Sequence, residues 1–374
     1  MRPDEQLNGA RLETLRALRN LTQQDLGTTL GLNQALVSKI EKGRTPLSLE
    51  TALKVSEAFR LPLSFFTVAV DPRDLGPITY RKTSRATVAD EKRVAALYTE
   101  ASRLFREVSE RSGYKQTTLP NATDLPSDPE TAAAHIRTST GLGPDEPILN
   151  LVRMLERQGV GVVTALDSDH AGTSLSQHAG ASRPSTISDR QLVAVVKEQP
   201  GAVQRFTLGH ELAHLVYDRS TTGASTSTRS VEELRANRFA GALLLPEQVV
   251  RERVSESLTL HGYLRIKADY GVSVGAIIRR ARDLGVITSG RYRSLNIQLS
   301  TQGWRTQEPV HVQAERPILL RQATAKAFSR SPVAEASDAC GVEIDLIQKW
   351  LGDDPTQSST NAANVIPLRS RRND

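Results

Sequence analysis

The chain has 374 residues, enough for two or three domains, and its hydrophobic fraction of 38% with only 4% aromatic residues favours helical cores built from Ala, Leu and Val. The formal net charge of +6 permits an anionic partner without requiring one. A single cysteine, Cys340, excludes a disulfide framework. The first residues lack the apolar core of a signal peptide, and no run approaches the length of a membrane span. We therefore expect a cytoplasmic protein with no membrane partner, mainly α with a small β-sheet (α+β).

Residues 1–69 are expected to form a five-helix domain. Thr22 is placed to cap a second helix that stops at Gly31, and Asn33 is placed to cap a third helix over residues 34–41. Two short helices joined by a glycine-centred turn within a bundle describe a helix-turn-helix domain. A generic helical bundle with an exposed polar face is the alternative, but the turn, the caps and the core positions agree on the first interpretation.

The segments 21–26, 31–34 and 38–44 resemble closely the Cro/phage-repressor (XRE) family of helix-turn-helix proteins. The resemblance implies that residues 34–39 form a recognition helix for a double-stranded DNA operator, and that the protein binds two-fold half-sites as a homodimer. It places Gln34 and Lys39 at base edges and Ala35 at a thymine methyl group. The other expected DNA-binding residues, several of them at phosphates, are Gln23, Asn33, Ser38, Lys42 and Arg44.

Residues 70–128 are assigned to a helical linker. A short extended piece ends at residues 78–82, and a helix with mixed charge follows from about residue 89 to 111. The apolar spacing of that helix predicts docking on another element, either a partner subunit or the core of the next domain. The proline-rich segment 120–129 is a linker by composition.

Residues 129–260 are assigned to a second domain, which opens with helices over 129–139 and 147–157 and a strand over 159–165. The apolar run 192–196 fits a buried strand, interpreted as an edge strand able to pair with an extended peptide. Residues 167–189, with His170 and His178, are expected to form a loop and hairpin in which both histidines are exposed rather than ligating. The Ser/Thr-rich run 220–230 is expected to be a loop.

The helix predicted over residues 206–217 carries the sequence His-Glu-x-x-His. Four residues separate His210 and His214, so their imidazoles lie on one helical face and point at a common position. Glu211 is placed to act on a water held by the metal without ligating the metal itself. Two zinc ligands and a general base have this spacing. The alternative, a core helix whose histidines are merely hydrogen-bonded, requires an improbable accidental match.

A catalytic zinc site needs a third protein ligand, and the helix predicted over residues 231–245 offers one. Glu233 and Asn237 lie on the same face of this helix, while its apolar residues pack in the core. Two histidines and a glutamate, with the fourth position left to water, form the catalytic pattern rather than the structural one. Asn237 is expected to orient a ligand without touching the metal.

Together, residues 210–214 and 233–246 resemble the ImmA/IrrE family of zinc metallopeptidases. The resemblance implies that Zn²⁺ is held by His210, His214 and Glu233, with Glu211 as the base, while the neighbouring Glu232 is the alternative third ligand. Many members have Gly before the second His and a further His four residues after it, where this chain has Ala213 and Asp218. Neither departure removes a ligand.

The resemblance also implies a protein substrate, namely a transcriptional repressor whose cleavage controls stress or mobile-element genes. Whether the chain would cut another repressor or itself stays open. Two further interpretations also stay open: a DNA-binding repressor whose zinc domain is a non-catalytic sensor, and a component of a toxin–antitoxin system.

Residues 261–353 are assigned to a helical C-terminal domain, and residues 354–374 to a disordered tail. Between residues 263 and 309, basic residues exceed acidic ones, which fits either nucleic-acid binding or an ordinary charged helix surface. Residues 332–352 have helix-turn-helix-like spacing that would equally suit a small helical cap.

Overall fold

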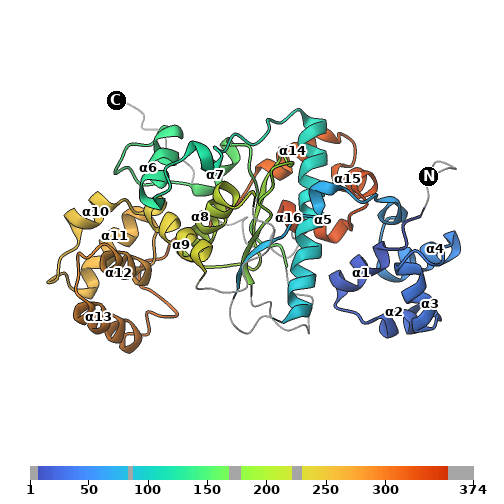
Figure 1. Cartoon of the computed structure of the whole chain (residues 1–374), viewed down its shortest axis with the longest axis horizontal. Coiled ribbons are helices and arrows are strands. Elements are labelled where there is room, and N and C mark those ends of the chain that lie inside the picture. The colour runs from blue at the N-terminus through green and yellow to red at the C-terminus, as the bar shows by residue number, and fades with distance from the viewer. Residues whose placement is uncertain (1–6, 83–86, 168–177, 221–229, 353–374) are drawn as a thin grey trace, which may run out of the picture.

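The computed structural model describes residues 7–82, 87–167, 178–220 and 230–352. The predicted loop residue His170, the side chain of His178 and the predicted tail lie outside what it describes. Figure 1 shows an elongated arrangement, with α1–α4 at one end, α10–α13 at the other and a small sheet between them. The mainly α architecture with a small sheet confirms the predicted fold class. None of the helices in the described part of the chain combines the length and the apolar character of a membrane span.

The N-terminal end is a helical bundle whose caps follow the sequence. Thr22 Oγ1 accepts a hydrogen bond from the Asp25 amide, Asn33 Oδ1 accepts one from the Leu36 amide, and Gly31 ends the second helix with a φ of 66°. These caps confirm the predicted turn between the second and third helices. The helices are α1 (Arg11–Arg19), α2 (Gln23–Leu30), α3 (Gln34–Glu41) and α4 (Leu49–Phe59), followed by the 3-10 turn η1 (Leu63–Thr67).

The sheet has the strand order β1-β3-β4-β2. Its strands are β1 (Thr79–Lys82), β2 (Gly161–Val163), β3 (His178–Ser182) and β4 (Leu192–Val195). β3 pairs antiparallel with both β1 and β4, while β2 pairs parallel with β4. The expectation that residues 192–196 form an edge strand is therefore wrong. β4 has a neighbour on each side and is buried along its whole length, as an uninterrupted apolar run favours.

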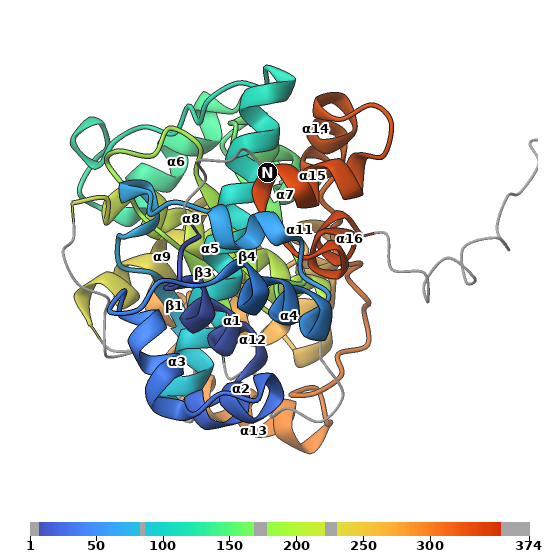
Figure 2. The ribbon, with the colours of Figure 1, turned by 90° about the vertical axis from the view of Figure 1, so that its right-hand side faces the viewer.

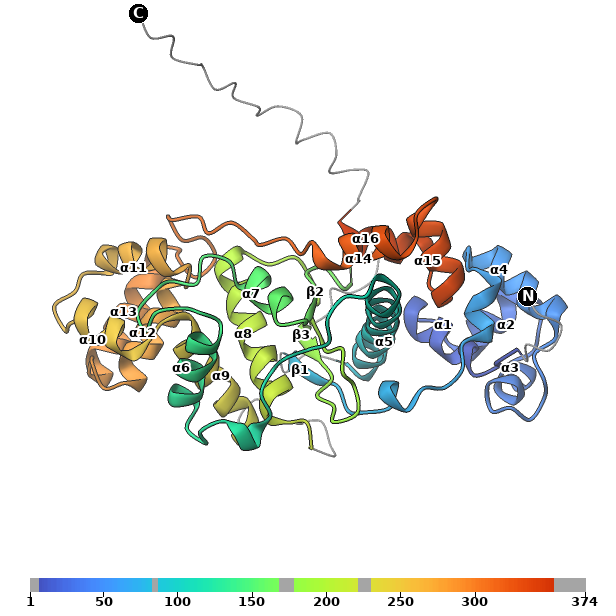
Figure 3. The ribbon, with the colours of Figure 1, turned by 90° about the horizontal axis from the view of Figure 1, so that it is seen from above.

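Helices cover both faces of the sheet, as the views in Figures 1 and 3 agree. Val193 and Val195 of β4 belong to the core packed against α8 (Gly201–Tyr217), while Leu192 and Ala194 belong to the core that contains α5 (Val88–Ser112). This alternation is the two-residue period of a strand buried on both sides. The sheet thus separates two hydrophobic cores.

The core on the α8 side carries the candidate metal centre and most of the C-terminal helices. Its other helices are α6 (Pro129–Ser139), α7 (Leu151–Arg157), α9 (Val231–Leu244), α10 (Glu247–Arg253), α11 (Tyr263–Tyr270), α12 (Val274–Asp283) and α13 (Ser289–Thr301). Helix α7 begins four residues later than predicted, because Asn150 Oδ1 accepts a hydrogen bond from the Arg153 amide and so caps the helix at that point.

The core on the α5 side is continuous from the helix-turn-helix bundle to the sheet. It also includes α14 (Leu319–Ala327), α15 (Pro332–Cys340) and α16 (Ile344–Leu351). Helix α14 packs on α5, α15 packs on η1, and Figure 2 shows α14, α15 and α16 grouped on one side of the molecule. Arg11 of α1 makes a bidentate ion pair with the buried Glu100 of α5, at 2.8 and 3.0 Å, and Arg19 pairs with Glu343 at 2.7 Å. Helix α5 is predicted to dock on another element, and it packs against the helix-turn-helix bundle.

Candidate metal centre and nucleic-acid interface

Helices α8 and α9 bring two neighbouring histidines together with a glutamate about twenty residues further along the sequence. His210 and His214 project from the same face of α8, and Glu233 comes from the first turn of α9. The two Nε2 atoms lie 3.1 Å apart, and the Glu233 oxygens lie 3.3 Å from His210 Nε2 and 3.3 Å from His214 Nε2. All three residues are buried, and within the described residues they are the group of donors able to hold a metal ion.

These distances suit a tetrahedral metal ion. With ligand bonds of about 2.0 to 2.2 Å, two ligands of a tetrahedral zinc lie about 3.3 to 3.6 Å apart, which agrees with the two 3.3 Å spacings and slightly exceeds the 3.1 Å between the imidazoles. Burial alone would favour neutral His214, but hydrogen bonds with Asp218 and Glu233 outweigh it and raise the pKa of His214 to about 10. The position between the donors therefore favours positive charge, which a divalent cation supplies as well as a proton does.

A buried chain of polar contacts fixes one of the two imidazoles. His214 Nδ1 lies 2.6 Å from Asp218 Oδ2, and the other oxygen of Asp218 accepts a hydrogen bond from Arg235 of α9. A carboxylate on Nδ1 holds the ring with Nε2 directed at the metal position and increases its basicity. Asp218 was noted in the sequence only as a departure from the family pattern. Its position four residues after His214 was the signal that could have identified it.

Glu211 lies beside these donors in a fully enclosed position, with no exposed surface. Its Oε2 accepts a hydrogen bond from Ser182 Oγ of β3 at 2.7 Å, while Oε1 has no partner among the described residues. Burial raises the pKa of Glu211. The carboxylate is thus held at one oxygen and available at the other, the arrangement that a proton acceptor needs. Ser182 stands in a serine-rich stretch, so nothing in the sequence distinguishes it from its neighbours.

The two remaining predicted residues of α9 occupy different positions. Glu232 is partly exposed, next to Glu233 but outside the group of three donors. Asn237 Nδ2 donates to the backbone carbonyl of Glu233 at 2.8 Å, one helical turn earlier. The described hydrogen bond of Asn237 is therefore with the helix backbone, whereas the carboxylate of Asp218 contacts the ring of His214.

The predicted DNA-binding residues lie on α2, α3 and the turn that follows. Figures 1 and 3 place α3 at the end of the molecule farthest from α10–α13. Ser38 is partly buried, and Gln23 Nε2 donates to Glu41 at 2.6 Å, which ties α2 to α3. The exposed members of the set are Asn33, Gln34, Ala35, Lys39, Lys42 and Arg44.

Three of the basic residues of 263–309 lie near acidic side chains. Lys267 and Arg280 are buried in ion pairs with Glu308 and Glu130, respectively, and Arg279 lies 3.7 Å from Asp283. Part of the apparent excess of charge is therefore neutralised by Asp283 and Glu308 of the same segment and by Glu130 of α6.

Comparison with known proteins gives matches to two separate segments of the chain. The family model described as Helix-turn-helix matches residues 12–66, and the peptidase M78 model, described as IrrE N-terminal-like domain, matches residues 155–282. The chain is 43% identical over 49 residues to the uncharacterized HTH-type transcriptional regulator MJ0272 of Methanocaldococcus jannaschii, across 13% of this chain and 74% of that protein. The chain therefore belongs to the family of HTH-type transcriptional regulators, and it joins a DNA-binding helix-turn-helix domain to a peptidase-type IrrE N-terminal-like domain.

Proposed function

We propose that this regulator is also a zinc-dependent endopeptidase that cleaves a transcriptional repressor, or its own chain, and thereby changes transcription. The observation that carries the proposal is the convergence of His210, His214 and Glu233 with Glu211 buried beside them. Three protein donors leave one position of a tetrahedral ion to water or substrate, which is the pattern of catalytic rather than structural zinc.

In this proposal His210, His214 and Glu233 hold the ion. Zinc supplies the Lewis acidity that makes water a nucleophile near neutral pH and draws electron density from the scissile carbonyl. Glu211 takes the proton of the attacking water on its unpartnered Oε1 and later delivers it to the leaving amine. Ser182, through its 2.7 Å hydrogen bond, keeps the carboxylate of Glu211 in place while its proton changes.

The DNA-binding part of the proposal uses the exposed residues of α3. Gln34 and Lys39 read base edges in the major groove, Ala35 contacts a thymine methyl group, and Lys42 and Arg44 contact phosphates. Gln23, held by Glu41, presents the start of α2 to a phosphate. Two copies occupy the half-sites of a palindromic operator.

The test combines cleavage with metal loading. The zinc-loaded protein is incubated with a protein extract of the cells that encode it, and new N-termini are mapped by mass spectrometry. We expect a small set of new termini, prominently in a DNA-binding repressor or in this chain. The same termini should be absent with Glu211→Gln, which keeps zinc, and with His210→Ala, which does not. Equal cleavage by Glu211→Gln would contradict the assignment of the base.

One observation favours a second function, in which the zinc domain is a sensor and cuts nothing. His210 and His214 are each 1% exposed and Glu211 is fully buried, so a peptide reaches them only after the site opens. A sensor predicts that zinc changes operator affinity in a gel-shift titration while no new N-terminus appears in the extract. An endopeptidase predicts the new termini.

A further inference from the structure

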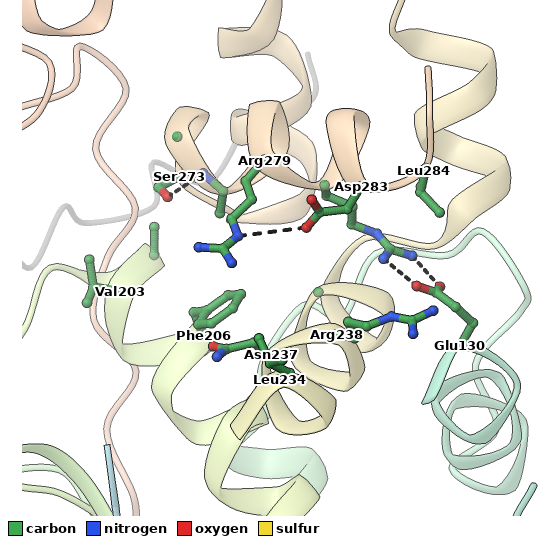
Figure 4. Close-up of a pocket in the computed structure, with 15 residues that line it drawn as sticks. Glu130, Val203, Phe206, Leu234, Asn237, Arg238, Ser273, Arg279, Asp283 and Leu284 are labelled. Atoms are coloured by element: carbon green, nitrogen blue, oxygen red, sulfur yellow. Dashed lines mark hydrogen bonds and ion pairs between the residues drawn. The ribbon is translucent and has the colours of Figure 1, made fainter. Parts of the chain in front are cut away.

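A cavity of about 580 Å³ is lined mainly by residues of α8, α9 and α12, and the first two of these helices also carry the metal donors (Figure 4). Its size falls within the range of about 300 to 1,000 Å³ that is typical of sites for small ligands. Neither the helix-turn-helix nor the three metal donors accounts for it.

On both α8 and α9, the cavity-lining residues nearest the metal donors lie about one helical turn or less from them. Phe206 precedes His210 by four residues on α8, and Asn237 follows Glu233 by four residues on α9. Four residues of α-helix advance about 6 Å. An extended peptide advances about 3.3 Å per residue. A peptide whose scissile bond lies at the metal position therefore places a side chain one or two residues away at this cavity.

The part of the wall formed by α8 and α9 is apolar and accessible. Val203 is 37% exposed and Leu234 is 46% exposed, and both line the cavity with Phe206. On the opposite side, Gly275 has no atom nearer than 4.0 Å to the place of a Cβ, and Ala276 is the next residue of α12. Small residues facing apolar ones leave room for an apolar side chain, whose burial would be favourable.

The rim carries three arginines, one in a close ion pair and two in loose pairs. Arg280 makes a bidentate pair with Glu130, at 2.8 and 2.6 Å, so neither group is available to a ligand. Arg279 extends from α12 toward Phe206 (Figure 4), with its Nε 3.7 Å from Asp283. Arg238 lies on the α9 side, 3.8 Å from Asp128.

Both of these distances exceed that of a hydrogen bond, and both arginine side chains are largely exposed, at 62% and 59%. Such surface pairs contribute little and exchange readily for a better-placed anion. Each of the three arginines at the cavity has one carboxylate near it, but only Arg280 is held by a close pair, so Arg279 and Arg238 are the groups that an anion can engage.

We propose that this cavity is the specificity subsite of the peptidase, and that it binds an apolar substrate side chain next to an acidic residue, within two residues of the scissile bond. The apolar side chain packs on Val203, Phe206 and Leu234, and the acidic residue pairs with Arg279 or Arg238. This inference rests on the proposed endopeptidase function, but its binding step can be measured without cleavage.

The experiment uses full-length, zinc-loaded protein with Glu211→Gln, so that peptides bind without being consumed. The probes are fluorescein-labelled pools of randomised decapeptides with a fixed central Leu-Glu, Leu-Lys or Ser-Glu pair, and affinity is read by fluorescence anisotropy. We expect the Leu-Glu pool to bind about tenfold more tightly than the Ser-Glu pool, as burial of a leucine side chain implies. It should also bind more tightly than the Leu-Lys pool.

Two variants, made in the same background, assign the preference to the cavity. Ala276→Trp fills it and should abolish the preference for Leu over Ser, whereas Ala134→Trp, at an exposed position of α6, should not. Arg279→Glu should make the Leu-Lys pool bind more tightly than the Leu-Glu pool. Arg265→Glu, at an exposed position of α11, should leave the preference for Glu over Lys unchanged.

Equal binding of the three pools would overturn the inference, as would an unchanged preference in both cavity variants. The outcome for the endopeptidase is separate. Cleavage of these pools by the protein with Glu211 intact, without any sequence preference, would leave the proposed function standing and remove the subsite. Selective binding without cleavage would support the subsite and overturn the proposed function.

Discussion

The substitution Gly180→Ala tests how tightly the sheet holds the proposed base. Gly180 lies in β3, where the backbone is extended, so alanine meets no conformational penalty there. An added Cβ would nevertheless lie 2.6 Å from Glu211 Oε1, 2.6 Å from Thr207 Cγ2 and 3.0 Å from Glu211 Cγ. Because Glu211 is fully buried, it cannot yield without moving its neighbours or giving up the hydrogen bond from Ser182.

Overpacking of this kind costs about 1 to 3 kcal/mol of the free energy of unfolding. A displacement of the base by about 1 Å lowers the rate of cleavage about a hundredfold. The three metal donors are not in the clash, so we expect zinc content to be unchanged. The measurements are urea unfolding, zinc content and the rate of cleavage.

Gly241→Ala is the matched control. Its added Cβ would lie 3.6 Å from the nearest atom, Arg280 Cδ, and alanine within a helix is favoured over glycine by about 0.5 to 1 kcal/mol. The control should therefore be as stable as the parent protein or slightly more stable. If Gly180→Ala proves equally stable and cleaves at the parent rate, the close packing of Glu211 against β3 is refuted.

Four further substitutions test other parts of the account. Asp218→Asn removes the carboxylate that contacts His214 Nδ1, so zinc affinity should fall about 10- to 100-fold in a chelator competition. An unchanged affinity would show that Asp218 does not position the ring. Glu100→Gln leaves the buried Arg11 and the partly buried Arg103 without their counter-charge, so urea unfolding should show a loss of about 3 to 5 kcal/mol. A loss under about 1 kcal/mol would show that this ion pair does not stabilise the bundle. Lys39→Ala should cost about 1 to 3 kcal/mol in operator affinity and relax specificity at one base pair. Arg44→Ala should instead weaken binding to all DNA sequences and reduce the slope of its salt dependence by about one charge. If gel shifts show the uniform loss with Lys39→Ala and the loss of specificity with Arg44→Ala, the two assigned roles are wrong.

Features set by neighbouring residues could be predicted from the sequence. The caps at Thr22 and Asn33 and the glycine turn between them follow from side chains within three residues of the backbone groups that they satisfy. The four-residue spacing of His210 and His214 likewise fixes their common face once the segment is helical.

Features that depend on distant pairing could not be predicted. β1 pairs with β3 through residues about a hundred positions apart, as Thr79 with Ser182, and four-residue strands carry too little pattern to specify their neighbours. Because β4 is equally short, its apolar run does not reveal that it has a neighbouring strand on each side. The contact of Ser182 with Glu211 and the packing of α5 under the helix-turn-helix bundle are likewise products of tertiary structure.

The measurement that tests the central claim most directly is the zinc content of two neighbouring variants, Glu233→Ala and Glu232→Ala, purified alongside the parent protein and titrated with a chelator. Glu233 lies 3.3 Å from both imidazoles, whereas Glu232 is partly exposed outside the donor group. We expect one zinc per chain in the parent protein and in Glu232→Ala, and loss of tight binding in Glu233→Ala. Tight zinc binding by Glu233→Ala, or a parent protein that takes up no zinc, would contradict the proposed metal centre.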